Sequence, residues 1–472
     1  MNKYDYILIG GGPTSLTLAW ILGSNNKKVL IIEKEDRLGG CHGVTRKDGY
    51  FTEHGPRVYS DSYLYFIELL KDMNMKFEDI FTRYNFQITK INDRTPLSFQ
   101  YFEYFAFFKT FVSLIINEDY GKTLSMKTFM ENNNFTSESK LYVDRVCRLT
   151  DGASYERYTL HQFLQLLNQQ LLYNLYQPKK PNDLGLIGLW SEKIYDTHNV
   201  HIILDEEVIK LNKFETKNKL ESVETTKGQY YGDNIILTIP PKPLYELIES
   251  SDIFGAFANK MNKNELKKWT LENSYFDYIC ITYHYNYIVD FPKLWGFSQG
   301  PWDIVFIILS NYMNLERDPK SKTLISIAIT KNNTKNEYGK TADDCLEEEL
   351  FKYVKEQLPF FPTPDKVILS PNMKHKDGKW SNEDTAFVIT TANKYLDYKT
   401  NIDNLYTVGI HNGNSSYKFT SLESAVQNAV YFVKNQLKDV KCNIMDKHIT
   451  NIRDLIIILL FVIILCIIIK KK

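Results

Sequence analysis

A glycine-rich loop between a short apolar strand and a helix constrains the fold of this 472-residue chain more than any other feature. Residues 6–9 (YILI) predict a buried strand, and residues 10–15 (GGGPTS) form the loop. An apolar run at residues 16–23 predicts a helix, and residues 29–32 (VLII) predict a second strand. This order of elements predicts a βαβ unit that opens a parallel sheet.

The spacing inside this loop predicts a dinucleotide site. Gly10, Gly12 and Ser15 follow the G-x-G-x-x-G fingerprint with its last glycine replaced. Gly10 permits a tight turn, Gly12 lets the backbone approach a pyrophosphate at the helix N-terminus, and Ser15 is small enough for helix–strand packing. Glu33 stands at the end of the second strand, where a carboxylate accepts hydrogen bonds from ribose hydroxyls. The same negative charge disfavours the 2′-phosphate of NADP. The alternative is a glycine turn without a ligand.

Charge and composition exclude several classes of protein. The 57 Lys and Arg residues balance 57 Asp and Glu residues, which argues against a nucleic-acid binder. An apolar fraction of 43% argues against disorder, and a mean hydropathy of −0.33 argues against several membrane spans. The six cysteines show no CxxC spacing, so we expect neither disulfides nor a zinc site. The length predicts two domains and a tail.

The C-terminus holds fifteen unbroken apolar residues, 455–469, followed by three lysines. A helix of this length covers about 22 Å, and snorkelling lysines or a thinned bilayer could bring it across. We predict a single-pass transmembrane tail anchor with the body facing the cytosol, because no signal peptide is visible. The alternative is a buried C-terminal helix or strand.

The middle of the chain predicts a second, mixed domain. Residues 50–180 are helical and rich in aromatics, and residues 102–116 are unusually apolar. That segment predicts either a buried helix or a helix that contacts a membrane or a substrate channel. Alternating runs between residues 275 and 309 predict an antiparallel sheet. The chain as a whole therefore predicts an α/β protein whose second domain is α+β.

Two segments after the second strand identify a resemblance. Residues 33–40 read EKEDRLGG, and residues 48–57 read DGYFTEHGPR. Arg37, Gly39 and Gly40 match the double-glycine motif of the flavin-dependent amine oxidase superfamily, which includes protoporphyrinogen oxidases and phytoene desaturases. The second segment, ending in Arg57, is most similar to a stretch of protoporphyrinogen oxidases. The resemblance implies a Rossmann-like FAD-binding domain.

Later segments extend this resemblance. Val208 matches a valine whose backbone contacts adenine, and Lys34 joins the expected cofactor contacts. Residues 405–429 resemble a second flavin motif, in which a strand ends at Gly409 and a helix begins near Ser421 and Leu422. No cysteine lies in residues 405–425, so we expect non-covalent FAD. The predicted divisions alternate between FAD-binding and substrate domains before the tail: FAD-binding 1–80, 181–245 and 376–440; substrate 81–180 and 246–375; tail 455–469.

The sequence departs from amine oxidases in the substrate domain, because residues 277–283 offer no lysine near the flavin. Arg57 is a candidate cation beside the flavin or a structural ion pair. Trp380 and Tyr417 are candidate walls of an aromatic box, or ordinary packing. We expect hydride transfer to flavin N5 from an amine or from an apolar lipid-, isoprenoid- or tetrapyrrole-like substrate.

Two other readings stay open. One is a redox-neutral flavoenzyme of the UDP-galactopyranose mutase type, and the other is a Rab-escort-like binding protein on the same fold. We expect a small-molecule or lipid-like partner, a membrane partner through the C-terminal helix, no nucleic acid and no metal. The sequence leaves the oligomeric state open.

Overall fold

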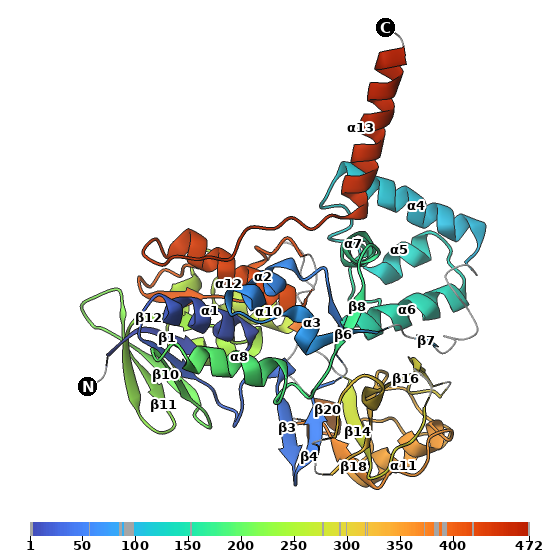
Figure 1. Cartoon of the computed structure of the whole chain (residues 1–472), viewed down its shortest axis with the longest axis horizontal. Helices are drawn as coiled ribbons and strands as arrows, with labels where there is room; N and C mark the ends of the chain where they lie inside the picture. The colour runs from blue at the N-terminus through green and yellow to red at the C-terminus, as the bar shows by residue number, and fades with distance from the viewer. Residues whose placement is uncertain are drawn as a thin grey trace.

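A computed structural model gives the architecture of the chain (Figure 1). It describes residues 3–55, 57–84, 87–88, 99–151, 153–275, 278–291, 294–298, 300–316, 318, 320–371, 373–381, 387–388, 394–417 and 420–470. Pro56 and most of the segment after Trp380 lie outside these residues, as does part of the strand in which a lysine was sought.

The first sheet has seven strands among the described residues, in the order β10-β11-β12-β1-β2-β9, with β22 added beside β12. Strand β1 pairs in parallel with both β2 and β12, which confirms the predicted βαβ unit with α1 as its helix. The sheet therefore joins strands from three distant parts of the chain. The bounds of these elements are β1 Lys3–Ile9, α1 Pro13–Ser24, β2 Val29–Ile32, β9 Val200–Ile203, β10 Val208–Lys213, β11 Leu220–Thr225, β12 Gln229–Leu237 and β22 Leu405–Thr407.

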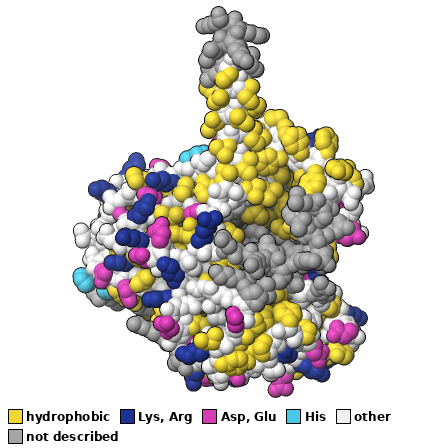
Figure 2. All heavy atoms as spheres, turned by 45° about the vertical axis from the view of Figure 1, so that its right-hand side comes forward, with side chains coloured by type: hydrophobic (Ala, Val, Ile, Leu, Met, Phe, Trp, Pro, Cys, Tyr) yellow, Lys and Arg dark blue, Asp and Glu magenta, His cyan; other side chains and the backbone are white. Residues whose placement is uncertain are grey.

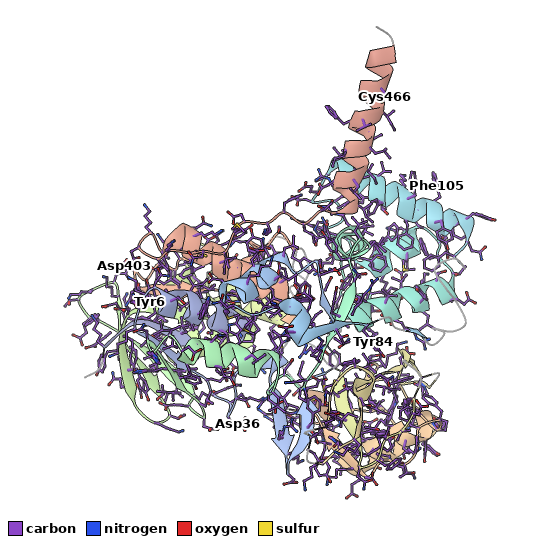
Figure 3. The ribbon with its side chains drawn as sticks, viewed as in Figure 1. Tyr6, Asp36, Tyr84, Phe105, Asp403 and Cys466 are labelled. Atoms are coloured by element: carbon purple, nitrogen blue, oxygen red, sulfur yellow. The ribbon has the colours of Figure 1, made fainter. Side chains whose placement is uncertain are left out.

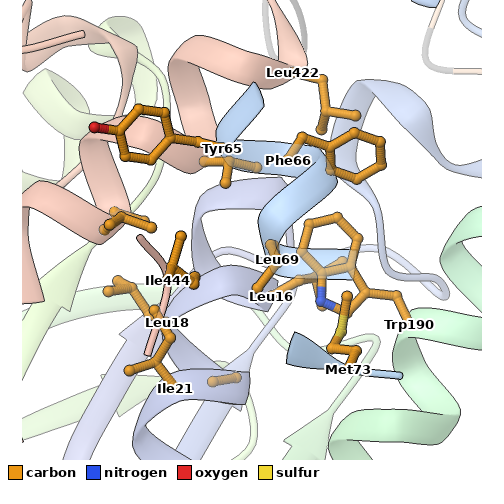
Figure 4. Packing of buried hydrophobic residues seen from close by; sticks show 14 of the residues in the cluster. Leu16, Leu18, Ile21, Tyr65, Phe66, Leu69, Met73, Trp190, Leu422 and Ile444 are labelled. Carbon is orange, nitrogen blue, oxygen red and sulfur yellow. The ribbon is translucent and has the colours of Figure 1, made fainter. Parts of the chain in front are cut away.

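Helices cover both faces of this sheet because side chains alternate along its buried strands. Leu8 and Ile31 face a cluster that includes α1, α2, α8 and α12, whereas Ile7 and Leu30 face α9 and α10. Figure 4 shows the first cluster, in which Trp190 lies beside the helices that carry its neighbours. The bounds of these helices are α2 Leu64–Asp72, α8 Leu186–Tyr195, α9 Pro241–Ser250, α10 Lys263–Glu272 and α12 Leu422–Gln436.

The second sheet has six strands among the described residues, in the order β18-β14-β17-β16-β15-β7. Its neighbours are antiparallel except for the edge pair β15 and β7, which agrees with the antiparallel sheet expected here. One face packs against α11, and the other carries Cys280, Ala328 and Val305 in register on three adjacent strands. The bounds are β7 Gln87–Ile88, β14 Ile279–Tyr285, β15 Leu294–Phe297, β16 Ile304–Ile308, β17 Thr323–Ile329, α11 Glu347–Gln357 and β18 Lys366–Leu369.

A layer of helices lies beside the second sheet, and its core is aromatic (Figure 1). Phe107 of α4 packs against Phe129, Phe135 and Phe163 at ring-centroid distances between 5.2 and 5.8 Å. Most of residues 101–170 therefore form helices. The bounds are α4 Tyr101–Ile116, α5 Met126–Asn132, α6 Ser137–Asp151 and α7 Leu160–Gln170.

The outer face of α4 is exposed rather than buried. Phe105 and Phe108 are 67% and 66% exposed, and Figure 3 shows Phe105 pointing away from the body. Figure 2 shows hydrophobic side chains gathered over α4 and the lower part of α13. The apolar segment at residues 102–116 is thus a helix with one face buried in the aromatic core and the other exposed, and both alternatives given for it remain predictions.

Helix α13 (Ile452–Lys470) projects from the body (Figure 1). Its base is attached because the backbone N–H of Arg453 donates to Asn168 and the Arg453 guanidinium donates to the carbonyl of Ile115. Across the described residues, no helix combines the length and the apolar character needed to cross a membrane. The predicted tail anchor at residues 455–469 and the membrane location built on it are therefore wrong. The physical shortfall is one of length, since fifteen apolar residues cover about 22 Å of a hydrocarbon core of about 30 Å.

Short elements connect the layers, and the domain divisions proposed from the sequence remain predictions. Small sheets pair β3 with β4, β8 with β5 and β6, β13 with β21, and β19 with β20. The bounds are β3 Val44–Lys47, β4 Tyr50–Glu53, β5 Tyr59–Ser60, α3 Phe77–Ile80, β6 Phe81–Arg83, β8 Leu175–Pro178, β13 Ser274–Tyr275, β19 Lys374–Lys376, β20 Lys379–Ser381 and β21 Phe387–Val388, with 3-10 turns η1 Gly40–His42, η3 Phe254–Phe257, η4 Leu309–Asn311 and η5 Ile410–Asn412.

Candidate functional site

A cavity of about 730 Å³ runs from the carboxyl ends of β1 and β2 to the inner face of the second sheet. Ligands of open α/β sheets bind at this edge, where strand ends leave a crevice. We call the part lined by the first sheet and its loops the cofactor half. The substrate half is lined by Tyr278, Val305, Ile307, Ala328, Thr330 and Arg148.

The glycine loop is shaped to let a ligand approach the backbone. Gly10 has φ +104°, and a Cβ there would lie 2.9 Å from the Cγ2 of Ile239, so glycine is required. A Cβ on Gly12 would meet no atom within 4 Å, and the residue lines the cavity at the N-terminus of α1. Gly12 thus opens the positive end of a helix to an anion.

The two glycine motifs meet. The backbone N–H of Gly39 donates to the carbonyl of Gly11 at 2.8 Å. A Cβ on Gly40, which has φ +53°, would lie 3.2 Å from the Cα of Gly12. Gly40 lines the cavity and Gly39 does not, so Gly39 serves the packing of the two loops.

Ser15 also acts through packing. It is fully buried, and its Oγ lies 2.6 Å from the Oγ1 of Thr238 at the end of β12. Ser15 does not line the cavity, whereas Thr238 does. The small residue at the third position of the fingerprint therefore fixes α1 against the strand end, as the motif requires.

Glu33 presents its carboxylate to the cofactor half. It accepts backbone N–H bonds from Gly11 at 2.5 Å and from Glu35 at 3.0 Å. Burial raises the pKa of Glu33, and the two backbone bonds oppose that shift. Each oxygen of this fixed carboxylate keeps lone-pair capacity for a ligand hydroxyl.

Further residues predicted from the sequence line the same half. They come from the loop after β2, from the start of β10 and from the entrance to α12. The side chain of Ser421 accepts from the backbone N–H of Ser424 and so caps α12. The predicted residues concerned are Lys34, Arg37, Val208, Gly409, Ser421 and Leu422.

Arg57 lies where the two halves meet. It lines the cavity and donates to the backbone carbonyl of Cys41. Beside it, burial raises the pKa of Glu53 to about 7, and the cation of Arg57 limits that rise. Burial also holds the pKa of His42 well below its usual range, so this histidine is neutral near pH 7, 3.2 Å from the Tyr59 hydroxyl.

The two aromatic candidates are separated by the fold. Tyr417 lines the cavity, with its hydroxyl 3.2 Å from Ser62 Oγ and its ring edge-on to Tyr63. Trp380 lies in the core of the second sheet, where its Nε1 donates to the carbonyl of Cys345 at 3.1 Å. The structure therefore places Tyr417 beside the cavity and Trp380 outside its described lining.

Sequence reasoning missed several lining residues. Glu206 lies two residues before Val208 and is buried. It stands within a recognised motif, so that proximity was a usable signal. Arg148 and Thr330 had no local signal, because α6 and β17 meet only in the folded chain.

Comparison with known proteins decides the family. The model of the flavin containing amine oxidoreductase family matches residues 16–263, more than half of the chain. The chain belongs to this family. The resemblance predicted from the motifs is confirmed, and with it, at the level of the family, a flavin-dependent oxidoreductase. Membership implies a flavin cofactor.

Curated relatives align with this flavin oxidoreductase over short stretches. A UDP-galactopyranose mutase of Mycoplasma genitalium is 36% identical over 62 residues, which are 12% of this chain and 15% of the relative. A chloroplastic protoporphyrinogen oxidase of Nicotiana tabacum is 30% identical over 60 residues, 13% of this chain and 11% of the relative. The chain therefore spans less than a sixth of the length of these relatives.

The similarity in three dimensions covers much more of the chain. A putrescine oxidase structure bound to putrescine aligns with 91% of this chain and 97% of its own, with a TM-score of 0.60 and 13% identity. At this identity the likeness establishes the fold. The α/β flavoprotein fold expected from the sequence is thereby confirmed for the body of the molecule.

Proposed function

We propose that the protein is an FAD-dependent oxidoreductase that oxidises an amine or an apolar lipid-, isoprenoid- or tetrapyrrole-like substrate. The observation that supports this most is the continuity of one cavity from the Gly10–Gly12 loop to the substrate half. Flavin supplies the redox chemistry when bound, accepting a hydride from the substrate and passing electrons to oxygen or another acceptor.

The lining of the cofactor half fits FAD on three counts. The open Cα of Gly12 and the N-terminus of α1 suit the pyrophosphate. The fixed carboxylate of Glu33 suits the ribose hydroxyls. The capped N-terminus of α12 at Ser421 offers a positive helix end to the flavin ring. These residues bind and orient the cofactor in the proposed function.

The remaining lining residues position the substrate. The substrate half offers water few hydrogen-bond partners because much of its lining is apolar and buried. The residues concerned are Val305, Ile307 and Ala328. Arg57 stands where the halves meet and Tyr417 lines the cavity, and we propose them as groups that contact substrate or cofactor. No proton-transfer group is needed for hydride transfer itself, because the cofactor carries the redox step.

The test is reconstitution of the purified full chain with FAD. We expect a yellow protein that holds about one FAD per chain, consistent with the single fingerprint. Acid precipitation is expected to release all the flavin into the supernatant, since we propose non-covalent binding. A colourless protein that cannot be loaded with FAD would overturn the proposal in favour of a binding protein of the Rab-escort kind.

The mutase reading has one observation in its favour, the 36% identity to a UDP-galactopyranose mutase over 62 residues. It predicts that only the chemically reduced flavoprotein acts, and that UDP-galactopyranose is isomerised without net electron transfer. The oxidoreductase reading predicts no turnover of that sugar nucleotide by the dithionite-reduced protein.

A further inference from the structure

The charges that line the cavity are unevenly distributed. The lining carboxylates of the described residues all belong to the cofactor half. The substrate half carries one lining charge among its described residues, the guanidinium of Arg148 near the end of α6. The lining acids are Glu33, Glu35, Glu206, Glu207 and Glu246.

Arg148 is held in a fixed orientation. Its Nε donates to Asp144 Oδ2 at 2.9 Å, and its Nη1 donates to the backbone carbonyl of Thr330 at the end of β17. Among the described residues, no hydrogen bond joins its Nη2 to a protein atom. The side chain is 17% exposed, so the third nitrogen of an aligned guanidinium remains for a ligand.

The surroundings of Arg148 do not cancel its charge. Asp303 is paired with Arg145 and with Lys331, and Lys331 lies 3.9 Å from Asp144. This cluster holds three cations, Arg145, Arg148 and Lys331. It holds two carboxylates, Asp144 and Asp303, so one positive charge is in excess. Beyond the adjacent Thr330, the sheet face of this half carries the apolar Val305, Ile307 and Ala328, so an anion bound there would be screened less than in bulk water.

We propose that the substrate half binds the carboxylate of an apolar organic acid, with Arg148 as the residue that holds it. This inference rests on the proposed function, since it names the substrate class of the same cavity. A guanidinium donates to a carboxylate through charge-assisted bonds, whereas a protonated amine would face a cation with no lining carboxylate nearby. The inference therefore favours the apolar class of substrate expected from the sequence over the amine, and adds to it a carboxylate.

Three matched probes test the charge preference directly. Octanoate, octylamine and octan-1-ol share one apolar chain and differ in the head group. Their binding to the FAD-loaded full chain can be measured by isothermal titration calorimetry near pH 7. We expect octanoate to bind at least about tenfold more tightly than octylamine, as a charged hydrogen bond allows. Equal or tighter binding of octylamine would overturn the proposal.

Arg148→Met removes the guanidinium and keeps an apolar side chain, so it separates the effect of the charge from that of the apolar wall. Octanoate affinity should fall about tenfold or more, while octan-1-ol affinity stays within about twofold. Arg148→Lys keeps the charge and should lose less octanoate affinity than Arg148→Met. The matched control is Arg157→Met, an exposed arginine outside the cavity lining, which should change neither affinity.

Retained octan-1-ol binding and an unchanged flavin spectrum show that Arg148→Met is folded. An equal loss for all three probes would assign Arg148 a purely structural role and overturn the proposal. A protein that binds no FAD contradicts the proposed function, whereas an FAD-loaded protein without octanoate preference contradicts this inference alone.

Discussion

The two halves of the cavity differ in how the chain builds them. The cofactor half is made from loops that follow strands of one sheet, and short motifs set its geometry. The substrate half is made where α6 meets the face of a second sheet, and residues far apart in the sequence create it. A motif therefore reports on the cofactor half, while only the folded chain reveals the substrate half.

The largest effect is expected from a side chain at Gly12, which would fill the space proposed for the pyrophosphate in the cofactor half. A Cβ there meets no protein atom, so Gly12→Val should fold while its side chain occupies the proposed pyrophosphate position. We expect FAD affinity to fall at least about a hundredfold, or about 3 kcal/mol. Fluorescence titration with FAD measures it.

Gly228→Val is the control, because a Cβ on Gly228 also meets no atom and the residue does not line the cavity. Its FAD affinity should match wild type. Equal losses in both variants would show that glycine replacement, rather than cavity filling, weakens binding.

A second change tests the independence of the substrate half. Ala328→Leu adds volume between Val305 and Cys280, whose strands lie on either side of β17. Ala328 lines the cavity, so the larger side chain takes up ligand space, and octanoate and octan-1-ol should both bind about tenfold more weakly, or by about 1.4 kcal/mol. FAD affinity should stay within about twofold of wild type, and a comparable loss of FAD would show that the halves are not separable.

The pH dependence of stability tests the contact between α12 and α2, which Glu423 makes. The Glu423 carboxylate accepts the backbone N–H groups of Tyr65 and Phe66, which joins α12 to α2. Burial raises the pKa of Glu423 to about 8 from its usual 4.5, so the folded state favours the protonated form. Its stabilising contribution is full below about pH 4.5 and is lost as the pH rises through about 8.

Glu423→Gln removes this titration. Between pH 5 and pH 8.5 the Tm of wild type should fall by roughly 2–4 °C more than that of the variant. Differential scanning fluorimetry of both proteins across this range gives the comparison. Parallel Tm profiles would contradict the assignment of the pH effect to Glu423.

The smallest effect is expected at Trp380, which the sequence offered as a wall of an aromatic box or as ordinary packing and which lies in the core of the second sheet. Trp380→Phe loses the bond from Nε1 to the Cys345 carbonyl and should cost about 1–2 kcal/mol in unfolding free energy. FAD and octan-1-ol affinities should be unchanged. A selective loss of affinity for FAD or for octan-1-ol, measured in the same titrations, would show that Trp380 contacts a ligand in the cavity.

The sequence allowed the cofactor half to be predicted because its signals are local. Gly10, Gly12 and Glu33 belong to one βαβ unit, so strand, turn and helix patterns place them without knowledge of the rest of the fold. Ser421 was placed in the same way, by a strand followed by a helix. The cavity lining contains all four of these residues.

The rest of the site depends on contacts that no short pattern encodes. Arg148 lines the cavity because α6 meets the end of β17, where its guanidinium bonds to Thr330. Trp380 lies outside the described lining because β20 places it in the core of the second sheet. The C-terminal anchor failed for another reason. The prediction relied on snorkelling lysines or a thinned bilayer to offset the short apolar run of α13, and no described helix meets the length and apolar character that a span needs.

The central claim is that one cavity binds FAD and an apolar ligand side by side. The most direct test is the visible difference spectrum of the FAD-loaded full chain during titration with octan-1-ol. We predict a saturable shift of the flavin bands with the calorimetric dissociation constant, weakened about tenfold by Ala328→Leu. Calorimetric binding that leaves the flavin spectrum unchanged would contradict the claim.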